Sequence, residues 1–321
     1  MRFNFHFSLV AILFSGVALA GDALPPPTTQ PTPEQAALLA EMATPEAQMK
    51  LWLGMIRRND FTPLATVIPE KEWAMVERGW KIQLAKQGPK ADAELDQQLA
   101  LLRTPGAVDA IMIKLQPELA KLNPVALATQ LRGLSGWLTP LAQQGDPASR
   151  KLDVAGLQSW VGDVADWLPK SGLNDKAKTR KAMESAVACV QALEVANVQQ
   201  LRQIHLRDML PRFGKALAAF KEMLRPYDLN LDALLDSVKI IKMAGEGGRR
   251  TMTVTYNTFG KQRQMDIDLV RRGTTWEVLG GQGAPFGQLG ALIDPMMSMV
   301  GMGTAKPVPA TPPEERPPGT L

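Results

Sequence analysis

One stretch of the chain, Ser237 to Gly281, alternates between apolar and polar residues with a period of two. Successive side chains of a β-strand point to opposite faces, so this period is typical of strands with one apolar and one polar side. The apolar members of three successive segments are Met252, Val254 and Tyr256, then Met265, Ile267 and Leu269, then Trp276 and Val278. Residues 238–243 are a candidate fourth strand, in which Lys239 and Lys242 interrupt an apolar run.

Glycine-containing breakers separate these segments and predict tight turns. They are residues 245–248, 259–261 and 272–273, and glycine accepts the positive φ that hairpin turns require. The simplest arrangement is an antiparallel meander of three or four strands with one face exposed to water. Such a sheet needs other elements to cover its apolar face. The sequence therefore predicts a predominantly helical α+β fold, with a multi-helix region over 33–228 and an α+β region over 229–302 that contains the meander and a closing helix.

The multi-helix region is predicted from a recurring start signal, in which Thr, Asn or Asp precedes Pro. The first residue can cap free N–H groups, and proline suits the first helical position. The six pairs are Thr44-Pro45, Thr62-Pro63, Thr104-Pro105, Asn123-Pro124, Thr139-Pro140 and Asp146-Pro147. Apolar residues at helical spacing accompany them, and the clearest stripe is Leu206, Met209, Phe213, Leu217, Phe220 and Leu224. Pro117 and Pro211 interrupt two helical patterns, where we expect a kink or a restart.

The end of the β stretch resembles a known family of small bacterial envelope domains. A helical segment at Leu231 to Asp236 leads into paired strands, and the last strands follow a pattern of Leu-Val, basic residues, Gly and then Trp-x-Val over 269–278. Residues 231–280 are in this respect similar to the closing half of the nuclear transport factor two-like domains, which have a cone-shaped α+β fold. The resemblance implies a curved sheet. It implies no particular activity, because the family contains enzymes, binding cups and scaffolds, and it transfers no catalytic residue.

The first 20 residues have the pattern of a cleavable signal peptide. Arg2 precedes an apolar run over 7–14, and the stretch ends in Ala18-Leu19-Ala20, the small-x-small pattern that signal peptidase requires. An uncleaved anchor is the alternative, but the apolar run is short for a membrane span of about 20 residues. We therefore expect cleavage after Ala20 and a periplasmic protein that does not span the membrane, with secretion as the alternative. Proline-rich segments at 21–32 and 303–321 are predicted to be a disordered leader and a disordered tail.

Composition limits the chemistry that the chain can perform. The formal net charge is +4 over 321 residues, which together with export gives no indication of nucleic-acid binding. The single cysteine, Cys189, cannot form an intrachain disulfide and is expected to be buried and inert. After Ala20 the only histidine is His205, so the usual zinc sites of Cys and His ligands cannot be assembled and no cofactor is expected. Asp266 and Asp268 share one face of a strand, where we expect them to pair with Arg250 or Arg263 rather than to act as acid and base.

Two sets of residues are candidate binding sites. The first is the apolar side of the predicted sheet, where a small hydrophobic ligand or an envelope protein partner would contact Met252, Tyr256, Met265, Ile267 and Trp276, unless helices fill that space. The second is Met296, Met299 and Met302, whose thioethers suit Cu(I), although methionine also fills irregular cores. The leading hypothesis is an exported envelope protein that acts by binding or assembly. An enzyme with a carboxylate and lysine site in the sheet concavity, and copper handling by methionine, are the alternatives.

Overall fold

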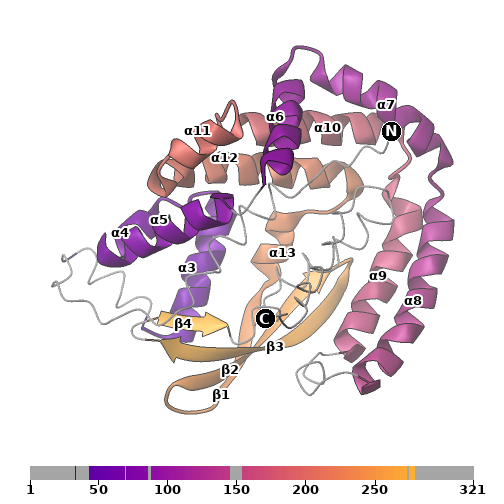
Figure 1. Ribbon diagram of the computed structural model, residues 1–321. Coiled ribbons are helices and arrows are strands. Elements are labelled where there is room, and N and C mark those ends of the chain that lie inside the picture. The colour runs from indigo at the N-terminus through magenta and orange to yellow at the C-terminus, as the bar shows by residue number, and fades with distance from the viewer. Residues whose placement is uncertain are drawn as a thin grey trace, which may run out of the picture. The chain divides into compact units, whose positions relative to one another are not determined.

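Within the described residues, helices occupy the chain between Pro45 and Ser237, and strands follow between Lys239 and Val278 (Figure 1). The computed structural model describes residues 33, 43–68, 70–85, 88–144, 154–272 and 275–278, all within one compact unit of residues 19–279. Its α-helices are α3 (Pro45–Arg58), α4 (Pro63–Val67), α5 (Glu70–Ala85), α6 (Pro89–Arg103), α7 (Ala107–Lys121), α8 (Pro124–Gln144), α9 (Val154–Ser171), α10 (Lys176–Gln191), α11 (Val198–Gln203), α12 (Leu206–Leu224) and α13 (Leu231–Ser237), and the short 3-10 helix η2 (Arg225–Tyr227) follows α12. The strands are β1 (Lys239–Ala244), β2 (Arg249–Thr258), β3 (Lys261–Arg272) and β4 (Thr275–Val278). The predicted helix-rich α+β fold is confirmed. The predicted closing helix falls outside the described residues.

Three of the predicted helix starts are confirmed. α3, α4 and α8 begin at Pro45, Pro63 and Pro124. The preceding residue caps the helix in two cases: Thr44 Oγ1 accepts a hydrogen bond from the backbone N–H of Ala47 at 3.2 Å, and Asn123 Oδ1 accepts one from that of Val125 at 3.0 Å.

Two other predicted helix starts were wrong. Pro140 lies inside α8 and starts no helix, and α7 begins at Ala107, after Gly106 turns the chain with a φ of 79°. Pro117 and Pro211 lie inside α7 and α12, and neither restarts its helix. A proline removes one intrahelical hydrogen bond, and tertiary packing can outweigh that loss. α8, for example, packs along α9. The pair Asp146-Pro147 lies outside the described residues.

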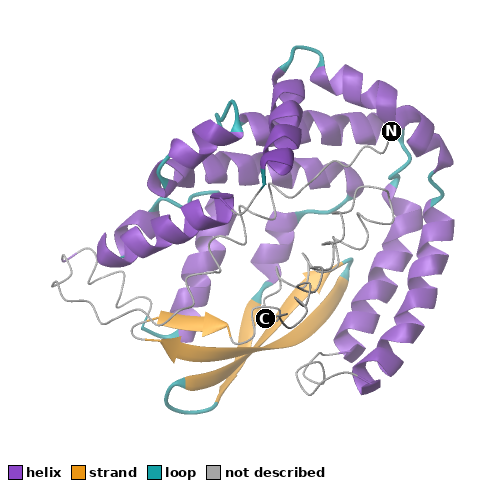
Figure 2. Ribbon diagram, viewed as in Figure 1, coloured by secondary structure: helices purple, strands orange, loops and turns teal. Residues whose placement is uncertain are grey.

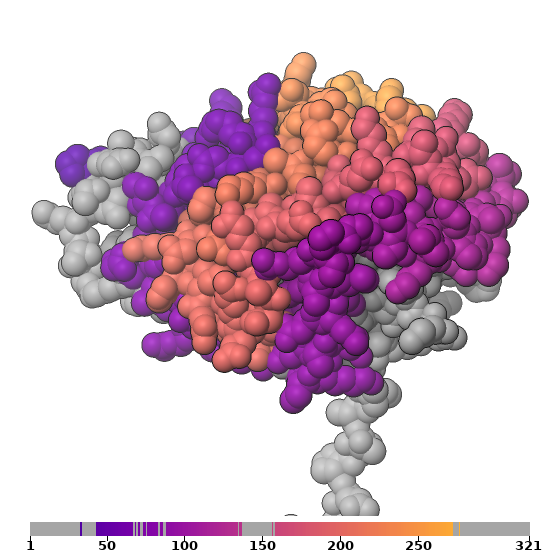
Figure 3. Space-filling model, turned by 90° about the horizontal axis from the view of Figure 1, so that it is seen from above, coloured from indigo at the N-terminus to yellow at the C-terminus, as the bar shows by residue number. Residues whose placement is uncertain are grey.

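The helical core forms around α12. Leu206, Met209, Phe213 and Leu217 of the predicted stripe are buried, and α10 packs against this helix. α6 and α7 contact α10 in turn, and their purple surface adjoins that of the later, salmon-coloured helices (Figure 3). At Gly214 the backbone of α12 comes so close to the carbonyl oxygen of Asn59, the residue that ends α3, that a Cβ atom would overlap it. In the described part of the chain, no helix is both long and apolar enough to span a membrane.

The sheet is an antiparallel meander with strand order β1-β2-β3-β4 (Figure 2). The β2–β3 hairpin turns through Phe259 and Gly260, which both have positive φ, at 50° and 76°. This conformation fits the twist of a two-residue hairpin loop. The four-stranded form of the predicted meander is therefore correct, and the glycine-rich segment 245–248 is the β1–β2 turn, as expected.

The sheet has one buried apolar face and one polar face. Met252, Val254, Ile267, Leu269 and Trp276 form a hydrophobic cluster on the apolar face. Gln48 of α3 fixes one end of this face, because its side chain forms hydrogen bonds with both the backbone N–H and the carbonyl of Trp276, at 2.8 and 2.6 Å. These two bonds also close the outer edge of β4.

Helix α9 holds the other end of the apolar face, at the tip of the β2–β3 hairpin. The ring of Phe259 contacts those of Trp160 and Trp167, with centroids 6.3 and 5.8 Å apart. Because Trp160 and Trp167 are one heptad apart, they lie on the same side of α9. Trp167 also donates from Nε1 to the carbonyl oxygen of Tyr227 at 2.9 Å, which links α9 to η2.

Candidate functional site

The predicted apolar binding wall is part of the core. Met252, Ile267 and Trp276 are 1%, 1% and 7% exposed, and Tyr256 and Met265 are half-buried. The side chains of Met49 and Val238 pack against the cluster. Buried residues of this kind stabilise the sheet but offer little surface to a ligand. The two hydrogen bonds from Gln48, a residue distant in sequence, explain how α3 comes to lie against this face.

The residues of the enzyme alternative do not come together. Asp266 and Asp268 are exposed on the polar face, where they accept hydrogen bonds from Thr253 Oγ1 at 2.6 Å and Thr251 Oγ1 at 2.8 Å. The expected pairing of these carboxylates with arginines is not what the structure shows, because Arg263 binds Asp163 and Arg250 binds the carbonyl of Gly245.

A buried lysine lies elsewhere, in the helical core. Lys221 of α12 is 3% exposed and donates to the carbonyl oxygen of Ile56 at 2.7 Å, to that of Arg57 at 3.2 Å and to Asp232 Oδ1 at 2.5 Å. It therefore caps the end of α3, where unpaired carbonyl groups favour a cation.

The remaining candidate residues divide into three cases. Cys189 is buried, and burial raises the pKa of its thiol to about 11, as expected for an inert cysteine. His205 is exposed at the start of α12, with Nδ1 3.3 Å from Glu77 Oε1. Met296, Met299 and Met302 lie outside the described residues, so the copper site stays a prediction. Within the described ranges, no three His, Cys, Asp or Glu residues are placed to hold a metal ion.

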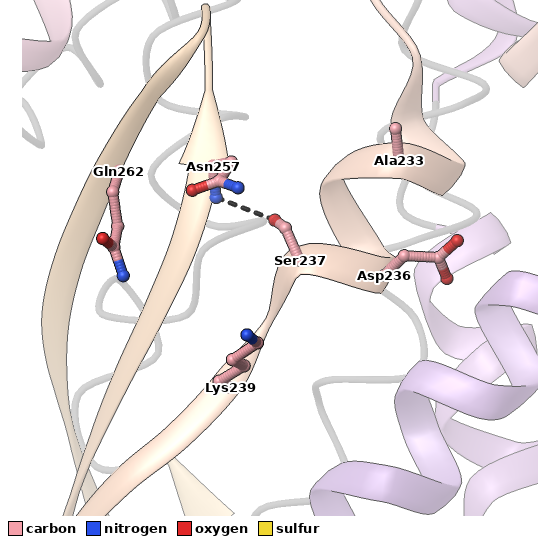
Figure 4. Close-up of a pocket in the computed structure, with 6 residues that line it drawn as sticks. All are labelled: Ala233, Asp236, Ser237, Lys239, Asn257 and Gln262. Carbon is pink, nitrogen blue, oxygen red and sulfur yellow. Dashed lines mark hydrogen bonds between the residues drawn. The ribbon is translucent and has the colours of Figure 1, made fainter.

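An open, polar groove lies at the end of the sheet, beside α13 (Figure 4). Its volume is about 530 Å³, and its lining residues are Ala233, Asp236, Ser237, Lys239, Asn257 and Gln262. These residues come from the end of α13, the start of β1 and the facing ends of β2 and β3. We refer to this depression as the polar groove.

Local sequence explains how the polar groove forms. α13 begins at Leu231, where Asn230 Oδ1 accepts from the backbone N–H of Ala233 at 3.0 Å, and β1 starts two residues after the helix ends. Ser237 joins the helix to the sheet, because its Oγ donates to the carbonyl of Leu234 at 2.6 Å and accepts from the backbone N–H of Asn257 at 2.7 Å. The hydroxyl of Ser237 thus extends the β1–β2 pairing beyond Lys239, which lies opposite Thr255.

The polar side chains of the groove differ in whether they have partners. Asp236 forms an ion pair with Arg57 Nε at 3.0 Å. Lys239 and the side-chain amides of Asn257 and Gln262 have no partner within the described part of the chain. Asn257 and Gln262 lie directly opposite each other in the β2–β3 ladder. The polar groove therefore presents one ammonium group and two amides without partners, beside the carboxylate of Asp236, which is paired with Arg57.

A cluster of charges fixes the hairpin that carries these amides. Asp163 of α9, 1% exposed, accepts from Lys261 Nζ at 2.7 Å and from the guanidinium of Arg263, which also binds Ser159. Asp166 lies 3.5 Å from Lys261 Nζ and binds Arg132 of α8 at 2.7 Å. We call these six residues the α9–β3 ion cluster.

The ion cluster shifts the pKa of its exposed members. The hydrogen bond to Asp163 raises the pKa of Lys261, and the hydrogen bond from Arg132 lowers the pKa of Asp166. Both shifts favour the charged forms that hold α9 to the hairpin.

Comparison with protein-family models, with curated proteins and with solved structures gives no match for this chain. The resemblance of residues 231–280 to nuclear transport factor two-like domains therefore stays a prediction.

Sequence reasoning missed the polar groove, although part of its signal was present. A two-residue turn at Phe259-Gly260 fixes the register, which places Asn257 opposite Gln262. Lys239 appeared only as an interruption in an apolar run. The contribution of α13 depends on Ser237, whose tertiary hydrogen bond has no local sequence signature.

Proposed function

We propose that this chain is an exported protein of a bacterial envelope that acts by binding a partner, and that the polar groove is its contact site. The observation that carries the proposal is the set of unpaired polar groups at Lys239, Asn257 and Gln262, which converge on one depression. Convergent polar groups at a concave surface provide orientation and specificity for a bound molecule.

The rigidity of the hairpin supports this assignment. Lys261 and Arg263 are tied to the buried Asp163, and Phe259 packs between two tryptophans of α9. Groups that are held in place before binding lose less conformational freedom when a partner arrives, which favours affinity. The hairpin is thus held on its apolar side and offers Asn257 and Gln262 on the other.

Export is supported by the pattern of residues 1–20 and is tested separately from binding. We expect osmotic shock of cells that express the full chain to release a protein whose N-terminus is Gly21, as identified by mass spectrometry. A mature chain that keeps Met1 would contradict the export proposal.

The binding role is tested by affinity capture from an envelope extract. The double variant Asn257→Ala/Gln262→Ala removes both exposed amides, and Lys176→Ala/Lys181→Ala is a control at exposed positions of α10. We expect the wild type and the control to retain the same partner and the groove variant to lose it. Capture that is equal for all three proteins, or absent from all three, would contradict the assignment of the polar groove.

A further inference from the structure

The two edges of the sheet differ. Gln48 closes the outer side of β4 with two hydrogen bonds to the backbone of Trp276. β1 is the opposite edge, and it pairs only with β2. Within the described residues, no hydrogen bond reaches the outward-facing backbone groups of residues 239–244. An open edge of this kind can pair with an added strand.

The open edge carries positive charge on one face. Lys239 lies opposite Thr255 and Lys242 opposite Thr253, because a bulge at Ile241 shifts the register between them. The two lysines therefore lie on the same polar face, beside neutral threonines. Both are exposed, and neither forms an ion pair with a described residue.

Among the described residues, no carboxylate pairs with either lysine, and Asp236, which lines the polar groove together with Lys239, is paired with Arg57. The acidic residues on the same face as the lysines belong to β3, which is two strands away from β1. At about 4.8 Å per strand, the backbones of β1 and β3 are roughly 10 Å apart. Asp266 and Asp268 are moreover engaged by the hydroxyls of Thr253 and Thr251.

The positive charge of Lys239 and Lys242 decides which kind of strand could pair with the edge of β1. A second copy of β1 would bring further lysines against Lys239 and Lys242, and like charges on paired strands are destabilising. Lysines and bulges on edge strands disfavour self-association for this reason. An acidic strand would instead be attracted to this edge. Alternate side chains of a strand lie on one face, so two carboxylates of the added strand can reach both lysines.

We propose that the open edge of β1 binds an extended acidic peptide segment of a partner protein, which adds to the sheet as a fifth strand. Carboxylates at alternate positions of the segment pair with Lys239 and Lys242, and the segment runs on into the polar groove. Ile241, 54% exposed at the bulge, supplies an apolar contact. The inference rests on the proposed binding function and specifies the chemistry of its partner.

Fluorescence anisotropy tests the charge requirement with a labelled nine-residue peptide that has Glu at alternate positions and Thr or Val between them. We expect the wild type to bind it and Lys239→Glu/Lys242→Glu to lose at least ten-fold in affinity. Lys176→Glu/Lys181→Glu, the same charge change on α10, should bind like the wild type. The Lys239→Glu/Lys242→Glu variant should in turn prefer a peptide with Lys at the alternate positions.

A second peptide tests strand addition. N-methylation of alternate backbone amides blocks β-pairing but keeps the charges, so it should abolish binding. Bound wild-type protein should also show slower amide hydrogen exchange across residues 239–244.

Three results would overturn the inference. The first is that the wild type does not bind the acidic peptide, and the second is that both double-lysine variants lose affinity equally. The third is that the N-methylated peptide still binds and β1 shows no slower amide hydrogen exchange. A partner captured through Asn257 and Gln262 in any of these cases would leave the proposed function standing.

Discussion

The carboxylate of Asp163 on α9 lies 2.7 Å from the ammonium nitrogen of Lys261 on β3, although 98 positions separate the two residues. Asp163 is buried, whereas Lys261 reaches it from the exposed end of the hairpin. The same carboxylate binds Arg263, so one acidic group on a helix fixes the start of a strand. This contact positions the hairpin end that forms one wall of the polar groove.

Replacement of Asp163 by Asn should destabilise the protein strongly. The change leaves Arg263 without its counter-charge in a partly buried position, and such loss of one partner costs about 3–5 kcal/mol. Urea unfolding followed by circular dichroism measures this loss. Asp166→Asn is the matched control on the same helix, and it should cost much less because Asp166 is exposed. Equal midpoints for the two variants would show that the buried carboxylate does not hold the hairpin.

The same glycine-to-alanine substitution should change the stability of the protein in opposite directions at Gly214 and at Gly79. Gly214→Ala should destabilise the protein by about 1–3 kcal/mol, because the new methyl group overlaps the carbonyl of Asn59 and forces α3 and α12 apart. Gly79 is exposed within α5 and has no atom near its Cβ position. Gly79→Ala should therefore stabilise by about 0.5–1 kcal/mol. A Gly214→Ala variant that unfolds at the same temperature as the wild type, or above it, would contradict the packing of α12 on α3.

Lys221→Met should also be destabilising, by about 3 kcal/mol or more, because it leaves Asp232 and two backbone carbonyls at the end of α3 without their shared donor. Lys215→Met is the control on the exposed side of α12, where the ammonium pairs with Glu194. Chemical denaturation distinguishes the two variants. If the Lys221 variant were as stable as the control, the lysine would not cap α3.

Burial of Cys189 predicts a pH dependence. Its pKa is raised to about 11 from an ordinary value of 9.0, so the folded state favours the neutral thiol. The stabilisation is complete below about pH 9 and is lost as the pH rises toward 11, because the unfolded chain ionises first. At pH 8 a disulfide reagent should react slowly with the native protein and rapidly after unfolding. Fast reaction of the native thiol at pH 8 would contradict this burial.

Much of the fold is predictable because its signals are local. The two-residue alternation of 251–256 and 265–269 identifies strands, and Phe259-Gly260 identifies the turn and register between them. Proline at positions 45, 63 and 124 marks helix starts where a capping residue precedes it. The same signal fails at Pro140, which lies inside α8, a helix that packs along α9.

The candidate site is less predictable because it depends on contacts between distant residues. Gln48 and Trp276, 228 positions apart, help to make the predicted apolar wall part of the core. The lysines of β1 were visible in the sequence, but only the strand order shows that they lie on an open edge. Asp163 was one acidic residue among many, and only its burial distinguishes it.

Photo-crosslinking in cells shows directly whether the hairpin end of the sheet contacts a partner. A photoreactive amino acid is placed at Gln262 in the polar groove, and in a second protein at Lys181, an exposed control position on α10. We expect a discrete higher-mass adduct in the envelope fraction from position 262 and none from position 181. Absence of an adduct at position 262, or the same adduct from both positions, would contradict this expectation.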